Sequence, residues 1–207
     1  MDTAQLAAIA STHRVHRTFA FLDLCGFTDF VDEHGDAGAV RELQELRSAV
    51  REVTPLFGVR VEKWLGDGLM IVGVDSEPLV GAALAIEQRH SGAGRLELRG
   101  GVASGEVILL EGDDYVGRAV NLASRLCDLA TPGQLIAAED DLELPEWVLT
   151  DEHDPVSVKG MAGQIRVVSL RPDATVLRRK ARTRSANALL AVVDGITRPM
   201  RPRAGVG

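Results

Sequence analysis

A Gly-Asp-Gly triplet between two apolar runs is the feature that most restricts how this chain can fold. The triplet is Gly66-Asp67-Gly68, and the apolar runs cover residues 59–65 and 69–74. Glycine and aspartate favour tight turns, and short apolar runs on both sides of such a turn favour paired strands. The pattern therefore predicts a β-hairpin that carries the carboxylate of Asp67 at its tip.

A second isolated aspartate follows another apolar run. Residues 18–24 predict a buried strand, with Asp23 near its end and Gly26 just beyond it. If this strand lies beside the hairpin, Asp23 and Asp67 meet at one edge of the sheet. Mg²⁺ usually binds one or two protein carboxylates together with substrate phosphates, so the pair suits a metal-bound triphosphate. The structural alternative makes Asp67 a turn former and Asp23 a helix N-cap.

The remaining patterns predict alternating helices and strands. Helices are expected over residues 36–53, 76–90 and 116–130, and strands over 96–110, 134–138, 147–151, 155–159 and 164–170. Pro55 and Gly58 are expected to end the first helix. This order predicts an α+β fold, with a ferredoxin-like antiparallel or mixed sheet and helices packed on one of its faces.

Charge divides the chain into an acidic body and a basic end. Residues 171–207 hold nine Lys or Arg and two Asp, whereas the rest holds 14 basic and 28 acidic residues. We expect an N-terminal arm or short helix over residues 1–16, one domain over 17–170 and a basic, flexible tail over 171–207, in which only 186–193 suits a helix. The tail can fold back, contact a partner subunit or bind an anionic surface. It lacks aromatic side chains for base stacking, so no nucleic acid is expected.

Nothing in the sequence indicates export or a membrane span. No apolar stretch approaches the roughly 20 residues that cross a bilayer, and the N-terminal residues lack the features of a signal peptide. Cys25 and Cys127 are expected to be reduced thiols of the core, and the five histidines lack metal-ligand spacing. These features predict a cytoplasmic protein without a transmembrane segment.

A further polar motif lies on the helix predicted over residues 116–130. Asn121 and Arg125 are four residues apart, so their side chains share one helix face. An amide and a guanidinium arranged in this way suit a ribose oxygen and a phosphate. The structural alternative is an ordinary solvated face.

In their order along the chain, these motifs resemble those of class III nucleotidyl cyclase catalytic domains, of the adenylate cyclase type. F-L-D-L-C-G-F-T is similar to the first metal motif of the family and K-W-L-G-D-G-L-M to the second. D-Y-V-G-R-A-V-N-L-A-S-R-L is similar to the helix motif, and V-K-G-M-A-G at 158–163 to the late lysine motif. The matches span about residues 17–170 and occur in family order.

The resemblance implies roles for the residues of the first two motifs. Asp23 and Asp67 match the two metal-binding aspartates, which implies two divalent ions in each site, Mg²⁺ or Mn²⁺. Lys63 and Asp114 match the pair that recognises the base. The structural alternative for Lys63 is an exposed lysine on a strand.

The helix and lysine motifs supply the remaining groups. Asn121 matches the residue that orients the ribose, Arg125 the arginine that stabilises the transition state, and Lys159 a lysine that binds the triphosphate. In this family the metal aspartates come from one catalytic domain and the other groups from a second. Because one chain here carries both sets, the resemblance implies a head-to-tail homodimer with two shared sites.

The base-recognition pair favours adenine. Lys63 only donates hydrogen bonds and Asp114 only accepts them, whereas adenine accepts at N1 and donates at N6. Guanine presents the reverse pattern, and each unpaired buried group costs free energy. We therefore expect an adenylate cyclase that converts ATP to 3′,5′-cyclic AMP and pyrophosphate. The alternatives are a guanylate cyclase and a non-catalytic, cyclase-like module that binds nucleotide.

The sequence departs from the family at one point. Many members carry an arginine that helps to bind the triphosphate, directly after an H-S-G or H-T-G turn. Here Ala103-Ser104-Gly105 is followed by Glu106. That phosphate contact is then either absent or supplied by another residue, for which Arg99 and Arg118 are the candidates.

Overall fold

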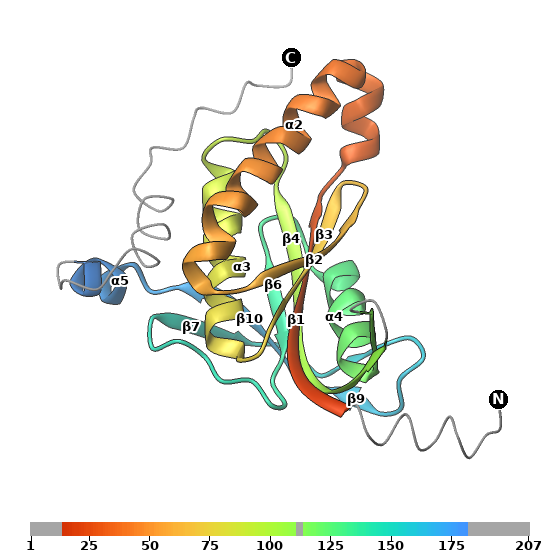
Figure 1. Cartoon of the computed structure of the whole chain (residues 1–207), viewed down its shortest axis with the longest axis vertical. Helices are drawn as coiled ribbons and strands as arrows, with labels where there is room; N and C mark the ends of the chain where they lie inside the picture. Colours follow the sequence, from red (N-terminus) through yellow and green to blue (C-terminus); the bar gives the residue numbers. More distant parts are fainter. Residues whose placement is uncertain (1–13, 111–113, 182–207) are drawn as a thin grey trace.

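The computed structural model describes residues 14–110 and 114–181 (Figure 1). The longer strands are β1 (Arg14–Leu24), β2 (Arg60–Leu65), β3 (Gly68–Gly73), β4 (Leu98–Leu110), β6 (Leu135–Ala138), β7 (Val148–Glu152) and β10 (Val167–Pro172). The short strands are β5 (Asp114–Val116), β8 (Val156–Ser157) and β9 (Gln164–Ile165). The helices are α2 (Phe27–Phe57), α3 (Ser76–Ser91), α4 (Arg118–Leu129) and α5 (Ala174–Ala181).

The main sheet has eight strands. Seven follow the order β2-β3-β1-β4-β6-β10-β7, and β5 pairs with β4 beside this row. Strands β4 and β6 are parallel, and the other pairs in the sheet are antiparallel. Strands β8 and β9 form a separate two-stranded sheet. The predicted α+β fold with a mixed sheet is confirmed.

Helices cover both faces of the main sheet, so the prediction that they share one face is wrong. Successive side chains of a strand point to opposite faces. On β1, Leu22 packs in a core with residues of α2 and α3, whereas Phe19 packs in a second core with residues of α4. Figure 1 shows α4 on the other side of the strands from α2 and α3. Periodicity identifies the apolar side of a helix but not the face of the sheet that it covers.

Helix α2 begins earlier than predicted, at Phe27, and contains a break. Gly35 has φ 67° and ψ 177°, which interrupts the helical backbone between two segments. The predicted end is confirmed. Gly58 follows the helix with φ 65° and donates its backbone N–H to the last turn, as a glycine in the left-handed region commonly does.

The folded part continues past Leu170, although the sequence places residues 171–207 in a flexible tail. Strand β10 runs to Pro172 and helix α5 follows it. Leu177 is fully buried in the core that α2 and α3 share, and Val176 packs against the same core. These two apolar residues attach the otherwise basic helix to the domain. The arm is predicted over residues 1–16, but residues 14–16 belong to β1. The first 13 residues of that arm and the predicted helix over 186–193 lie outside the described residues. Within residues 14–110 and 114–181, no helix is long and apolar enough to cross a membrane.

Candidate active site

The register of β1 and β3 determines where the two motif aspartates lie. Asp23 is directly opposite Gly68, the residue that follows Asp67. Gly66 turns the hairpin between β2 and β3 with φ 72°, a conformation that glycine adopts without steric cost. Asp67 is therefore held at the tip of the hairpin, at the edge of the sheet where β1 ends.

Gly68 allows close contact between the hairpin and β1. A Cβ atom at this position would lie 2.8 Å from the carbonyl oxygen of Leu22 and 3.1 Å from Oδ1 of Asp23. Those separations are too short for an ordinary side chain. The glycine is therefore needed for space, and its absent side chain leaves Oδ1 of Asp23 facing the hairpin.

The environment of Asp67 raises its pKa. The largest cause is partial burial, which disfavours the charged carboxylate, and the negative charge of Asp23 adds to it. A hydrogen bond from the backbone N–H of Asp67 itself and the charge of Arg99 act in the opposite direction. The two carboxylates are thus close enough to repel each other.

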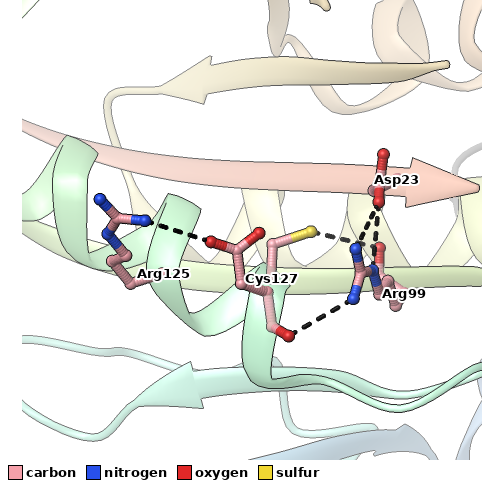
Figure 2. Close-up of polar contacts among 5 residues, drawn as sticks. Asp23, Arg99, Arg125 and Cys127 are labelled. Carbon is pink, nitrogen blue, oxygen red and sulfur yellow. Dashed lines mark hydrogen bonds and ion pairs between the residues drawn. The ribbon is translucent and has the colours of Figure 1, made fainter. Parts of the chain in front are cut away.

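Arg99 forms the closest polar contact of Asp23. It lies directly opposite Asp23 on β4, and its Nε and Nη2 donate hydrogen bonds of 3.1 and 2.8 Å to Oδ2 of Asp23. Its Nη1 also donates to the carbonyl oxygen of Asp128, at 3.4 Å (Figure 2). The sequence suggested Arg99 only for a phosphate contact. The register of β1 against β4 would have revealed this partner.

A depression of about 170 Å³ lies beside these groups. Its lining includes Asp23 from β1, Gly68 from the hairpin, and Ser124 and Asp128 from α4. A larger groove of about 640 Å³ runs along α2 and contains none of the motif residues. Because Asp23 lines the smaller depression, this depression is the candidate site for metal binding, although Asp67 is not part of its lining.

Lys63 and Asp114 meet in the fold although they come from different strands. Nζ of Lys63 donates a hydrogen bond to Oδ1 of Asp114. Their side chains are 46% and 53% exposed, so both remain accessible to a ligand. The hydrogen bond with Asp114 is the largest cause of the raised pKa of Lys63. Neither residue lines the depression at Asp23.

Asn121 and Arg125 are exposed on α4. Nη1 of Arg125 lies 3.5 Å from Oδ2 of Asp128, a distance typical of a weak surface ion pair. Figure 2 shows Arg125 and Asp23 at opposite ends of the group of polar contacts. Lys159 is exposed between β8 and β9. One chain thus joins Lys63 with Asp114 and places Asp23 near Asp67, but it does not gather all seven residues around one depression.

The departure from the family pattern lies inside a strand. Ala103, Ser104 and Gly105 belong to the middle of β4, and Oγ of Ser104 is 2.8 Å from Oγ1 of Thr18. Glu106 is exposed, as is Arg118 at the start of α4. This segment therefore presents a carboxylate at the position where many family members present an arginine.

The donor set at Asp23 and Asp67 fits a hard divalent cation that arrives with a triphosphate. Among the residues that the structure describes, no group of three or more His, Cys, Asp or Glu side chains could hold a metal ion by itself. A cation bound near both carboxylates would reduce the repulsion between them. Mg²⁺ sites in nucleotide enzymes commonly complete their coordination with substrate phosphates and water.

Comparison with known sequences finds related proteins in Mycobacterium tuberculosis. An uncharacterised protein is 36% identical over 152 residues, which cover 72% of this chain and 40% of that protein. A pH-sensitive adenylate cyclase is 32% identical over 174 residues and is matched over 76% of this chain and 41% of its own length. The chain thus spans less than half the length of these relatives. No protein-family model matches the chain.

Comparison with solved structures finds cyclase catalytic domains. The catalytic core of a rhodopsin–guanylyl cyclase with converted specificity, in complex with ATPαS, superposes with a TM-score of 0.69 at 21% identity, over 78% of this chain and 98% of that one. The adenylyl cyclase CyaB from P. aeruginosa superposes with a TM-score of 0.63 at 20% identity, over 76% and 94%. The predicted resemblance is confirmed: this chain has the fold of a class III nucleotidyl cyclase catalytic domain.

Proposed function

We propose that this chain is an adenylate cyclase domain that converts ATP to 3′,5′-cyclic AMP and pyrophosphate. Its site would use two divalent ions, Mg²⁺ or Mn²⁺, at Asp23 and Asp67. The observation that carries the choice of ATP is the contact between Lys63 and Asp114. Their donor and acceptor atoms are close enough together to meet N1 and N6 of one adenine ring.

In the proposed reaction, the 3′ oxygen of the ribose bonds to the α-phosphorus as the bond to pyrophosphate breaks. Bound divalent ions lower the cost of the charge on the attacking oxygen and on the leaving group. Asn121 orients the ribose, and Arg125 stabilises the charge that develops on the α-phosphoryl oxygens. Lys159 binds the triphosphate. The 3′ hydroxyl loses its proton to solvent, so no side chain is assigned as a general base.

The fold by itself does not select the base. A rhodopsin–guanylyl cyclase with converted specificity binds ATPαS with the same fold. Recognition of adenine therefore rests on the side chains that face the ring. Lys63 offers only hydrogen-bond donors and Asp114 only acceptors, which matches adenine at both positions and guanine at neither.

We also propose that two copies of the chain form head-to-tail shared sites. Asn121 and Arg125 are exposed on α4 and do not line the depression at Asp23. A second copy related by twofold symmetry would supply these groups to the first copy, and the first would do the same for the second. Each dimer would then contain two equivalent sites. A cytoplasmic location remains a prediction of the sequence.

The test is turnover by the purified chain with ATP or GTP, in the presence of Mg²⁺ or Mn²⁺. We expect cyclic AMP from ATP and far less cyclic GMP from GTP. We also expect Asp23→Asn and Asp67→Asn each to abolish the metal-dependent product. Preference for GTP would favour a guanylate cyclase. Absence of either product, with nucleotide still bound, would favour a non-catalytic module.

A further inference from the structure

The two oxygens of the Asp23 carboxylate have different neighbours. Oδ2 accepts both hydrogen bonds from the Arg99 guanidinium, at 3.1 and 2.8 Å. Oδ1 faces the hairpin, 3.1 Å from the position that a Cβ atom at Gly68 would occupy. The carboxylate is thus held in one orientation, with one oxygen toward β4 and the other toward the strand that follows Asp67.

We propose that Arg99 is a positioning residue for metal binding, which holds Oδ2 of Asp23 so that Oδ1 faces the hairpin that carries Asp67. This inference rests on the metal site of the proposed function. Arg99 itself does not contact metal or nucleotide in this arrangement. It acts through the orientation of the carboxylate that does.

Arg99 is held firmly enough to serve this purpose. Its backbone is paired directly opposite Asp23, so the two side chains leave neighbouring strands at the same level. Nη1 donates a longer hydrogen bond, of 3.4 Å, to the carbonyl oxygen of Asp128 at the end of α4. The side chains of Arg99 and Asp23 are 29% and 27% exposed. A guanidinium that donates two hydrogen bonds to one oxygen restricts rotation of the carboxylate more than a single donor does.

The positive charge of Arg99 opposes metal binding, whereas its hold on the orientation of Asp23 favours it. A positive group beside Asp23 repels a divalent cation, so removal of the charge favours metal binding even if the orientation of Asp23 is lost. Arg99→Ala mixes these two effects. Arg99→Lys keeps the charge and removes the two-point contact, because an ammonium lacks the planar fork of a guanidinium. The lysine variant therefore isolates the positioning effect.

The experiment measures binding of Mn²⁺ alone to the full chain by electron paramagnetic resonance. We expect Arg99→Lys to weaken Mn²⁺ affinity by about 10-fold, as substitutions of groups that orient metal ligands commonly do. The Mn²⁺ concentration for half-maximal turnover should rise by the same factor, with KM for ATP at saturating metal unchanged. Unchanged Mn²⁺ affinity in Arg99→Lys would overturn the proposal, and so would a wild-type chain that binds no Mn²⁺.

Arg89→Lys is the matched control. Arg89 also donates from Nε and Nη2 to a single carboxylate oxygen, Oε2 of Glu52, but it lies on α3 away from the depression. Its substitution should leave Mn²⁺ affinity unchanged. An equal loss in both lysine variants would indicate a general effect on folding and would overturn the proposal.

A second variant perturbs Oδ1 of Asp23, the oxygen that Arg99 does not contact. Gly68→Ala would place a methyl carbon 2.8 Å from the carbonyl oxygen of Leu22 and 3.1 Å from Oδ1 of Asp23. It changes no charge, but the hairpin must shift away from β1, so Mn²⁺ binding should weaken here too. Normal affinity in this variant would contradict the assigned role of Oδ1. If the wild-type chain makes no cyclic nucleotide but both variants weaken Mn²⁺ binding, the proposed function fails and the role of Arg99 stands.

Discussion

Glu42 and His90 form a buried polar contact that joins helices α2 and α3. His90 is 0% exposed and Glu42 3%, and Nε2 of His90 lies 3.2 Å from Oε1 of Glu42. The Glu42 carboxylate also accepts the backbone N–H groups of Arg95 and Leu96, at 2.8 to 3.0 Å. The contact therefore ties both helices to the loop that leads into β4, the strand of Arg99.

This contact predicts acid sensitivity of the fold. Burial raises the pKa of Glu42, but His90 and the backbone N–H groups of Leu96 and Arg95 lower it more, so the net shift is downward from 4.5. A carboxyl with a lowered pKa stabilises the fold above its unfolded pKa, and that stability is lost as the pH falls through the folded pKa. We expect the free energy of unfolding, measured with urea from about pH 6 to about pH 3.5, to fall less steeply in Glu42→Gln than in wild type.

Glu87 provides a control of opposite sign. It is buried near His90, and burial raises its pKa. A carboxyl with a raised pKa increases the free energy of unfolding as the pH falls. Without it, in Glu87→Gln, the free energy of unfolding should therefore fall more steeply toward low pH than in wild type. If both glutamine variants changed the slope in the same direction, the assignment of the pH dependence to Glu42 would be wrong.

Lys63 offers a separate test of base recognition. Lys63→Met removes the amine that we propose as the donor for N1 of adenine and leaves an unbranched side chain that is one atom shorter. We expect kcat/KM for ATP to fall by about 10- to 100-fold, because a base contact is left unpaired. Steady-state rates with ATP measure the effect. The control is Arg171→Met, which breaks an exposed ion pair with Asp151 where β10 meets the opposite edge strand, β7. A loss of similar size in the control would contradict the role of Lys63.

At the scale of elements, α4 depends on a close approach to β4. A Cβ atom on Gly101 would lie 2.2 Å from the backbone nitrogen of Cys127 and 2.3 Å from the carbonyl oxygen of Ala123. Helix α4 therefore packs directly on the strand backbone. The helix that carries Asn121 and Arg125 can lie this close to β4 only because Gly101 has no side chain.

Gly101→Ala should displace α4 and destabilise the fold. Overpacking of this kind typically costs about 1–3 kcal/mol, and the surface of α4 that carries Asn121 would shift with the helix. Urea unfolding measures the stability, and turnover of ATP measures the shift. A variant with wild-type stability and activity would show that α4 can move without cost.

Most elements could be predicted from local patterns, because the features that define them are local. The predicted turn lies at Gly66-Asp67, between β2 and β3, and Gly68 is the first residue of β3. Gly58 ends α2 as predicted. The face of the sheet that α4 covers and the burial of Leu177 could not be predicted. Both depend on contacts between segments far apart in the sequence, which periodicity within one segment does not record.

The same distinction applies to the candidate site. The motif residues could be named from the sequence, since each motif is short and continuous. The contact between Asp23 and Arg99 could not, because it depends on the register of β1 against β4. The fold was also needed to show that the seven motif residues do not gather around one depression.

At the scale of the whole molecule, we propose that two chains share each cyclase site. The direct test mixes two inactive variants, Asp23→Ala and Arg125→Ala, under conditions in which subunit exchange is demonstrated. Half of the dimers should then contain one of each chain, and each mixed dimer should hold one complete site. The predicted result is about a quarter of wild-type cyclic AMP production.

The control mixture combines Asp23→Ala with Asp67→Ala. Both substitutions affect the metal-binding half of the site, so no mixed dimer contains a complete site and no activity should return. Recovery with Arg125→Ala but not with Asp67→Ala is the result that shared sites predict. No recovery in the first mixture, with exchange demonstrated and the wild-type chain active, would contradict the claim.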